Sequence, residues 1–423
     1  MKRLYIYIIV SLVALSMGAA RIHDAIKHDI NVASANNHEY PFLTANPPAE
    51  TPAPAGYEPF YLSHYGRHGS RWLIGYGQYD SAIKQLERAQ RNGHLTKLGE
   101  KTLATLRQIR TNAEGHSGAL SQKGAHQHQA IASRMFKKYR AIFAGKATVD
   151  AKSTIVKRSI ESMDNELATL KQLNPELDIV RAEGKENMWF LNYTDSVAIE
   201  FRKPIRAGLK KTMDERMDTR RFMQQLVDDV QFVADSIDAP TFLNNMWAIA
   251  SNQQSEYTDV SLYHLFKPEE TFPIWEYYNL VWYTGYGPYA PVKGRGMYSQ
   301  ANLLQDFIDR ADEAIAGNGT AANLRFGHDT VVMPLVALMG LDGYGEETDD
   351  IDSVASFWDY GKAIPMGANV QLVFYRNASG DVLVKALLNE REVSLPLTPV
   401  AYPYYRWADV RTYFVSRTVV PSL

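Results

Sequence analysis

Alternating apolar and polar positions mark strands at both ends of the chain. Phe60–Ser63 alternates in this way and leads to Gly66, which predicts a strand that enters a tight loop. Residues 324–326 predict another strand, which is broken by Gly327 and followed by an apolar helix over 331–339. Polar residues therefore follow two predicted strands directly.

The same patterning predicts further elements of an α/β fold. Residues 120–143 predict a helix with Ser121 as its N-cap, because apolar residues recur on one face. Residues 154–156 form a short β-branched run, which predicts a strand. Alternation over 370–384, interrupted by turn residues at 377–381, predicts a hairpin.

The middle of the chain has a different pattern. Residues 164–312 contain helix-like segments such as 216–237, several tryptophans and few β-branched runs. We therefore predict an α/β domain, formed by residues 57–163 and 313–423, with a central mainly parallel sheet flanked by helices. The segment 164–312 is expected to be an inserted α-rich cap domain that roofs a site at the carboxyl ends of the strands.

The N-terminal residues predict export. Lys2 and Arg3 precede the apolar run Leu4–Leu15, and small residues follow it up to Ala20. This order is typical of a cleavable signal peptide over residues 1–20, and the run is too short to span a bilayer as a mature helix. An N-terminal anchor or a buried helix is the alternative.

A proline- and alanine-rich stretch follows the predicted signal peptide. Between Asn31 and Pro59 the chain carries prolines at short intervals and has no helical period. Such a stretch is typical of an extended segment. We therefore expect residues 21–56 to form an extended arm that leads into the fold.

Composition restricts the partners and the compartment. The 423 residues include 45 basic and 47 acidic side chains, a net charge of −2, so no global basic field indicates a nucleic-acid partner. Any anionic ligand must be bound by a local cluster of cations. The chain has no cysteine, which excludes disulfides and thiolate catalysis. Together with the signal-like start, this favours a periplasmic or secreted protein without stable membrane insertion.

Arg67, His68 and Arg71 form the first candidate site. They follow the first predicted strand directly, where an α/β sheet presents ligand-binding groups. Guanidinium groups match the geometry of phosphate oxygens, and a histidine among cations is pushed towards its neutral, nucleophilic form. The alternatives are a solvated basic loop or a core histidine with its hydrogen bonds satisfied.

Two further segments carry complementary groups. His328 can donate a hydrogen bond to a phosphoryl group, and Asp329 can protonate a leaving alkoxide and then activate water. Alternatively, the aspartate is a helix N-cap, a role that is compatible with anion binding. Arg158 follows the predicted strand over 154–156, although a lone arginine there is usually a surface residue.

Six segments together resemble one known family. The run Tyr57–Arg71 resembles the start of the histidine acid phosphatases, above all the bacterial members of the multiple inositol polyphosphate phosphatase branch. The further matches occur in family order: Leu120–Gly124, the Arg158 segment, Gly285–Pro288, Gly327–Asp329 and Val384–Glu390. The resemblance extends from about residue 40 to the C-terminus. It implies a phosphoglycerate mutase-like α/β fold.

The resemblance also implies roles for the candidate residues. His68 would be the nucleophile that forms a phosphohistidine, and Asp329 would be the proton donor. The phosphoryl oxygens would be bound by Arg67, Arg71, Arg158 and His328. Neither a metal nor a cofactor is implied, since the arginines neutralise charge as a magnesium ion does elsewhere.

One departure from the family pattern affects the expected substrate. The inositol polyphosphate branch usually carries His-Ala-Glu at the second motif, whereas this chain has His328-Asp329-Thr330, similar to bacterial phytases and acid phosphatases. We expect a secreted phosphomonoesterase that hydrolyses inositol polyphosphates such as phytate. The alternative is a broad-specificity acid phosphatase that acts on sugar or other organic phosphate monoesters.

Other classes of protein are less compatible with these residues. The expected partner is a small phosphate ester, and we expect a monomer. A phosphomutase would share the Arg-His-Gly start, but it needs neither a signal peptide nor a large insertion. A non-catalytic phosphate- or glycan-binding protein of this fold would lack catalytic groups, whereas His68 and Asp329 are both present. The cap residues carry no readable motif, and its basic residues Arg202, Lys203, Arg206, Lys210 and Lys211 are candidates for substrate contacts.

Overall fold

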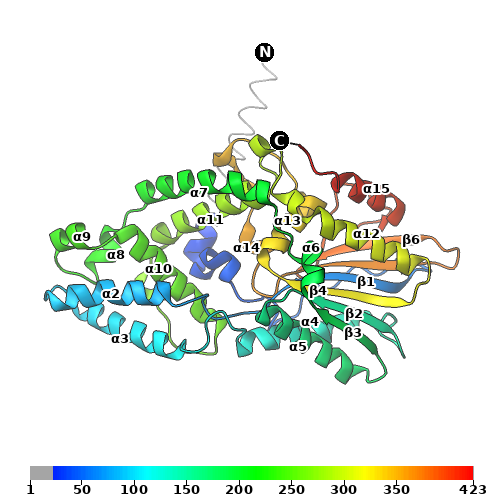
Figure 1. The fold of residues 1–423 in the computed structure, drawn as a ribbon, viewed down its shortest axis with the longest axis horizontal. Coiled ribbons are helices and arrows are strands. Elements are labelled where there is room, and N and C mark those ends of the chain that lie inside the picture. The colour runs from blue at the N-terminus through cyan, green and yellow to red at the C-terminus, as the bar shows by residue number, and fades with distance from the viewer. Residues whose placement is uncertain (1–21, 423) are drawn as a thin grey trace, which may run out of the picture.

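The computed structural model describes residues 22–422, which form two parts of different composition. One part, on the right of Figure 1, is a sheet covered by helices on both faces, and the other, on the left, is helical. The predicted α/β class, with mostly parallel central strands flanked by helices, is confirmed. The predicted signal peptide, residues 1–20, lies outside the described residues.

The sheet has eight strands in the order β3-β2-β4-β1-β5-β6-β7, and β8 pairs with β6. Strands β1 to β4 pair in parallel, whereas β5 to β8 add an antiparallel edge. The strand bounds are as follows: β1 Glu58–Arg67, β2 Thr148–Ser153, β3 Asp178–Glu183, β4 Thr320–Gly327, β5 Asn369–Arg376, β6 Val382–Leu388, β7 Arg391–Val393 and β8 Tyr405–Arg406. Side chains of β1, β4 and β5 are buried almost continuously, because helices cover both faces of the sheet.

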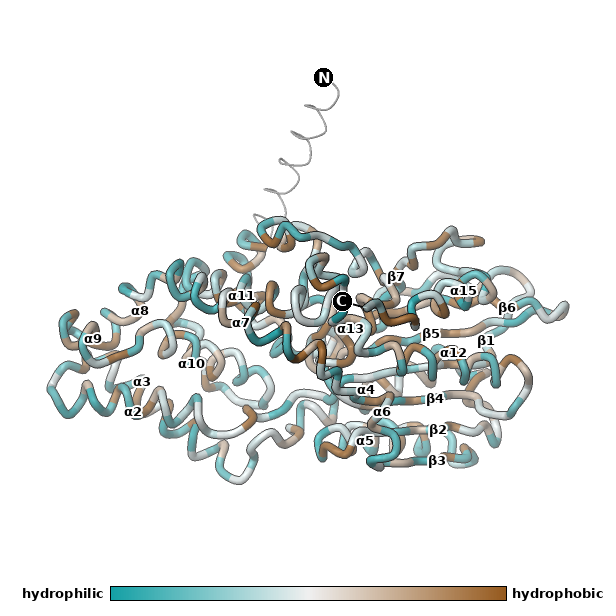
Figure 2. Tube along the Cα trace, turned by 45° about the horizontal axis from the view of Figure 1, so that its top comes forward, coloured by the Kyte–Doolittle hydropathy of each residue, from teal (hydrophilic) through white to brown (hydrophobic). Residues whose placement is uncertain are grey.

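Helices on the two faces of the sheet bury separate apolar surfaces. Helices α4 (Gln122–Lys138) and α5 (Lys157–Leu173) lie on one face, and α12 (Ala301–Ile315), α13 (Asp329–Met339) and α15 (Trp407–Arg417) lie on the other (Figure 1). Helix α13 is apolar on all sides, as its hydrophobic colour in Figure 2 shows, and its residues from 331 to 339 are all buried. The helices that cover the sheet thus position the loops at the strand ends.

The helical part is packed against the sheet part through a shared core. One hydrophobic cluster runs from α13 into this part, so the two parts form a continuous interior. Its helices are α2 Gly77–Arg91, α3 Lys97–Asn112, α6 Met188–Leu191, α7 Ser196–Arg216, α8 Arg220–Gln224, α9 Val230–Ser236, α10 Ala239–Asn252 and α11 Pro268–Tyr286. Short elements complete the chain: η1 Ile30–Asn37, η2 Lys185–Asn187, η3 Gln253–Ser255, η4 Tyr263–Leu265, η5 Ala290–Val292, η6 Met297–Gln300, η7 Leu341–Gly343, η8 Ile351–Ser356 and α14 Tyr360–Ala363.

Most elements predicted from the pattern are present, with shifted ends. The strands near 60 and 324, the helices after Ser121 and at 331–339, and the hairpin are confirmed. Ser121 caps α4, since its side chain accepts a hydrogen bond from the Gly124 N–H. The strand predicted at 154–156 is wrong in position, because β2 ends at Ser153 and these residues form the turn into α5.

Three predictions about the middle and the arm need correction. The helix expected over 216–237 is instead two short helices, α8 and α9, since α7 ends at Arg216 and Asp229 caps α9 separately. The cap boundary expected at 164 falls inside α5, and β3 still pairs with β2 in the sheet. Conversely, α2 packs against α10 within the helical part. The sequence of an amphipathic helix or a short strand does not specify which hydrophobic surface the element covers. Tertiary packing therefore decided where the sheet part ends and the helical part begins.

The arm expected over residues 21–56 is extended only in its second half. Residues 22–28 are helical, and η1 forms a 3₁₀ turn immediately after them. The first proline of the described arm is Pro41, so nothing in the preceding residues prevents helical turns. In Figure 1 this blue segment lies between the two parts of the molecule, and its position matters for the site.

Candidate active site

Adjacent parallel strands bring the two histidine segments together. In the register of β1 and β4, Arg67 is opposite Gly327, so His68 and His328 follow at the same edge of the sheet. The His68 N–H donates to the Gly327 carbonyl over 2.9 Å, and the two imidazole centroids are 5.7 Å apart. Arg158 lies in the first turn of α5, after β2. The strand ends therefore bring the sequence-predicted residues into one neighbourhood.

The hydrogen bonds of His68 determine which ring nitrogen is available. Its Nδ1 lies 2.9 Å from the Gly69 carbonyl oxygen, which can only accept, so Nδ1 carries the proton and Nε2 keeps a lone pair. Burial, followed by the charges of Arg67 and Arg158, lowers the pKa of His68 well below its usual value. His68 is therefore a neutral imidazole whose Nε2 can attack an electrophile.

Three guanidinium groups surround this imidazole and retain unused donors. Arg67 is fully buried, and its Nη1 donates to the carbonyl oxygens of Ile364 and Asn36. Within the described part of the chain, the buried Nε atoms of Arg67, Arg71 and Arg158 have no hydrogen-bond partner. Buried donors of this kind are costly unless an anion accepts from them. The cluster is thus suited to a phosphoryl group.

The pKa values of the arginines reflect the cost of burying them. Burial lowers the pKa of Arg67 and of Arg158, and it lowers that of Arg71 to about 10 with a contribution from Arg67. The nearest compensating charge is Asp329, whose Oδ2 lies 2.8 Å from Arg67 Nη2. One carboxylate among these three cations leaves a net positive site.

The second motif supplies a neutral histidine and a charged carboxylate. Burial, followed by Arg158, lowers the pKa of His328 to about 4, and its Nε2 lies 3.2 Å from Thr154 Oγ1. Burial of Asp329 opposes its ionisation, but Arg67, Arg71 and His328 outweigh it and hold the pKa below the usual value. The Asp329 side chain is 17% exposed, and its Oδ1 accepts from the Thr330 N–H over 2.8 Å. This partly exposed carboxyl group can exchange a proton with a bound ligand.

A close backbone approach holds the loop after β1. A Cβ added to Gly69 would lie 2.5 Å from the Gly124 carbonyl oxygen, and one on Gly124 would lie 2.2 Å from that of Ser70. Gln127 is buried, accepts from the Ser70 N–H over 2.8 Å and donates to Ser70 Oγ over 3.0 Å. This close packing requires residues without a Cβ at both positions.

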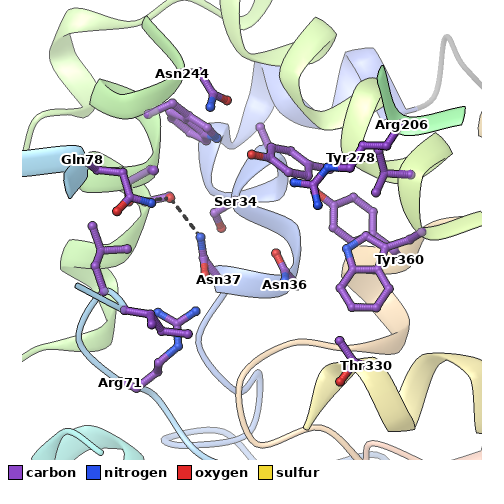
Figure 3. A pocket seen from close by; sticks show the side chains of 18 of the residues that line it. Ser34, Asn36, Asn37, Arg71, Gln78, Arg206, Asn244, Tyr278, Thr330 and Tyr360 are labelled. Carbon is purple, nitrogen blue, oxygen red and sulfur yellow. Dashed lines mark hydrogen bonds between the residues drawn. The ribbon is translucent and has the colours of Figure 1, made fainter. Parts of the chain in front are cut away.

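A cleft of about 360 Å³ opens beside Arg71 and Thr330. Figure 3 shows its labelled polar lining, which comes from η1, from the sheet part and from the helical part. Aromatic rings, including Trp247, Tyr278 and Trp282, form much of the remaining wall. Residues of α7, α10 and α11 therefore line the cleft together with η1 and the sheet part.

Only one of the five basic cap candidates lines this cleft. Arg206 does, whereas the guanidinium of Arg202 stacks on Tyr286 at 3.8 Å and donates to the Gly285 carbonyl. Each of the three lysines instead forms an ion pair on its own helix: Lys203 with Glu200, Lys210 with Asp214 and Lys211 with Glu215.

The sequence interpretation missed the residues that support the site. Asn36 of η1 donates to Asp329 Oδ2 over 3.2 Å, and Ser162 of α5 accepts from the Gly69 N–H over the same distance. Gln127, six residues after Ser121 and beyond the Leu120–Gly124 motif, was also missed. The helical period that places Gln127 on the buried face of α4 is the one signal that pointed towards it.

Among residues 22–422, no group of three or more histidine, aspartate and glutamate side chains is arranged to hold a metal ion. His128 is buried against Glu166, while His126 contacts Tyr257. In the same range, no helix is long and apolar enough to cross a membrane.

The fold and the site together define a class: an α/β protein with a neutral histidine among arginines where its parallel strands end. The chain belongs to the histidine phosphatase superfamily (branch 2), whose family model matches residues 67–389. The expected histidine acid phosphatase family is thereby confirmed. No curated protein matches the chain by sequence.

Solved structures of similar fold come from phosphatases. The multiple inositol polyphosphate phosphatase of Bifidobacterium longum, in complex with inositol hexasulfate, has a TM-score of 0.75 at 20% identity, over 90% of this chain and 96% of that one. The phytase from D. castellii has a TM-score of 0.68 at 14% identity, over 92% and 86% of the two chains. A Klebsiella sp. phytase has a TM-score of 0.51 at 14% identity, over 87% and 98%. At these identities the likeness is one of fold.

Proposed function

We propose that the protein is a secreted phosphomonoesterase that hydrolyses inositol polyphosphates such as phytate through a phosphohistidine on His68. One observation carries the proposal: a neutral imidazole with a free Nε2 lies among guanidinium groups whose buried Nε–H donors are unpaired. Catalysis of phosphoryl transfer depends mainly on positioning and on neutralising charge, and this arrangement supplies both.

In the first step, the phosphoryl oxygens accept hydrogen bonds from Arg67, Arg71, Arg158 and His328. His68 Nε2 attacks phosphorus, so the N–P bond forms as the bond to the leaving oxygen breaks. A protonated Asp329 gives its proton to that oxygen, and the alcohol departs.

In the second step, the Asp329 carboxylate takes a proton from water as the water oxygen attacks phosphorus. The N–P bond breaks, its electron pair returns to His68 Nε2, and inorganic phosphate leaves. Asp329 is then protonated again for the next cycle, and no net charge accumulates on the site.

Substrate binding reconciles the low pKa of Asp329 with its role as an acid. In the protein alone, Arg67 and Arg71 hold that pKa down. A bound phosphate dianion neutralises these cations and adds negative charge beside the carboxyl group, so it raises the pKa of Asp329. The proton donor is therefore formed when it is needed.

Inositol polyphosphates are proposed because the bifidobacterial phosphatase was solved with inositol hexasulfate. The lining of the cleft favours the alternative, a broad-specificity acid phosphatase for sugar or other organic monoesters. Among the described residues that line it, Arg71 and Arg206 are the cations, and the remainder are aromatic, amide, hydroxyl or aliphatic. A polyphosphate leaving group would gain more from a cationic wall than a sugar would.

Hydrolysis of an aryl phosphate tests the reaction, and a comparison of phytate with a sugar monophosphate tests the substrate. His68→Ala is expected to abolish turnover, and retained turnover would remove His68 as the nucleophile. Arg206→Ala should raise KM for phytate more than for the sugar phosphate, with exposed Lys211→Ala as the control. Equal KM changes on both substrates, together with faster turnover of the monophosphate, would refute the phytate assignment.

Secretion rests on the signal-like N-terminus, and we propose a periplasmic or secreted location. Sequencing the N-terminus of the protein produced in a Gram-negative host tests this. Cleavage near residue 20 is expected. An intact Met1 on protein recovered from the cytoplasm would contradict it.

A further inference from the structure

The N-terminal segment η1 forms part of the wall of the cleft beside Arg71 and Thr330. Ser34, Asn36 and Asn37 line the cleft, and Figure 3 shows them between Arg71 and the side chains of the helical part. The segment packs against α10, α11 and α14, and Asn37 Nδ2 contacts Ser251 Oγ at 3.5 Å. A stretch more than 290 residues before Asp329 in the sequence is thus built into the same site.

The backbone of η1 adopts an unfavourable conformation directly before Asn36. Ala35 has φ 46° and ψ −108°, in a region that residues other than glycine rarely adopt. Such a conformation is strained and persists where surrounding packing imposes it. Ala35 is buried, and a Cβ on Gly361 of α14 would lie 2.9 Å from its Cα. The packing therefore fixes the direction in which Asn36 leaves the segment.

Asn36 contacts both members of the central ion pair. Its Nδ2 donates to Asp329 Oδ2 over 3.2 Å, the same oxygen that lies 2.8 Å from Arg67 Nη2. Its main-chain carbonyl accepts from Arg67 Nη1. The Thr330 N–H donates to the other carboxylate oxygen, so Asn36 and Thr330 together define the plane of the carboxyl group.

We propose that Asn36 is a positioning residue for Asp329. When the N–H groups of Arg67 turn to a phosphoryl oxygen, the carboxyl group loses part of its ion pair, and the amide of Asn36 keeps it in place. The same N–H group stabilises the carboxylate that forms after Asp329 protonates the leaving oxygen. This inference rests on the proposed function, in which Asp329 is the acid.

The electrostatic effect of Asn36 has a defined sign. Its hydrogen bond favours the charged form of Asp329 and contributes to lowering the pKa of that residue, alongside the neighbouring charges. The titratable and charged groups that face Asp329 from neighbouring elements are Tyr65, Arg67, Arg71, Arg158 and His328. Removal of the amide leaves these groups unchanged, so the pKa of Asp329 should rise.

Steady-state kinetics with two esters test the proposal. For Asn36→Ala we expect kcat on glycerol 2-phosphate to fall about tenfold, the loss of one hydrogen bond to a charged group. Turnover of 4-nitrophenyl phosphate should fall much less, since its leaving group needs little protonation. The alkaline limb of the pH profile of kcat on the alkyl ester should move to higher pH, because Asp329 then stays protonated up to a higher pH.

Two more variants control for folding of the segment. Asn31→Ala removes a half-buried side chain of η1 that donates to Asp29, not Asp329, and should behave as the wild type. Asn36→Asp keeps the shape but replaces the donor by a carboxylate, so it should shift the limb further upward than Asn36→Ala does.

Equal losses on both esters with an unmoved alkaline limb would overturn the proposal and assign Asn36 a purely structural role. Wild-type kinetics for both Asn36 variants would overturn it as well. These outcomes differ from failure of the proposed function, which would appear as retained turnover in His68→Ala. An inactive His68→Ala beside unaltered Asn36 variants would reject this inference alone.

Discussion

Substituting alanine for Gly69 tests whether the backbone contact between the loop after β1 and α4 positions His68, the proposed nucleophile. In the structure, a Cβ on residue 69 would lie 2.5 Å from the Gly124 carbonyl oxygen, 2.7 Å from its Cα and 2.8 Å from its carbonyl carbon. All three atoms belong to the backbone at the start of α4, so no side-chain rotation relieves the overlap.

The distance by which the loop or the helix must move determines the expected loss of activity. Carbon atoms in contact prefer a separation of about 3.5–4.0 Å, so the loop or the helix must move by about 1 Å. His68 is the adjacent residue and would move with the loop. A displacement of about 1 Å at a reacting group costs roughly 100-fold in rate. Overpacking of this kind also destabilises the fold by about 1–3 kcal/mol.

The assay is kcat/KM on 4-nitrophenyl phosphate together with the urea midpoint of unfolding. Gly77→Ala is the matched control, because a Cβ there meets nothing within 4 Å and its φ is ordinary. Gly124→Ala should reproduce the loss from the opposite side, and the double variant should lose less than the product of the two. Wild-type kcat/KM in Gly69→Ala, with the protein folded, would refute the link between this contact and the position of His68.

Three further predictions concern proton transfer, the buried amide and pH. Asp329→Asn should slow hydrolysis of alkyl esters by about 100-fold but that of activated aryl esters far less, and equal losses would remove Asp329 as the acid. Gln127→Leu leaves the Ser70 N–H unpaired and should lower the free energy of unfolding by about 1–3 kcal/mol, so an unchanged urea midpoint would contradict it. Burial raises the pKa of Glu256 from 4.5 to about 7, so the folded state binds this proton more tightly and stability falls as pH rises through that window. Glu256→Gln should therefore be more stable than the wild type at pH 8 by about 1–3 kcal/mol and should gain no stability at pH 4. Parallel curves of unfolding free energy against pH for the two proteins would show that Glu256 does not cause this pH dependence.

Local sequence patterns were sufficient to predict elements whose structure depends on residues close to one another in the sequence. The period of apolar positions predicted the helix after Ser121, and alternation predicted the terminal hairpin. These patterns were insufficient where tertiary contacts determine the bounds of a helix or strand. The helix expected over 216–237 is interrupted because separate caps and packing faces form there, and the strand expected at 154–156 is a turn.

The sequence by itself determined which chemistry the site contains. Groups that follow parallel strands meet at one edge of the sheet, so the placement of His68 and His328 directly after strands was enough to bring them together. Only the tertiary structure decided which residues surround these catalytic candidates. Asn36 lies 293 residues from Asp329, and a single amide in a proline-rich arm carries no periodicity that predicts the contact. Burial sets the low pKa of His68, and burial arises only when both parts of the molecule close over the strand ends.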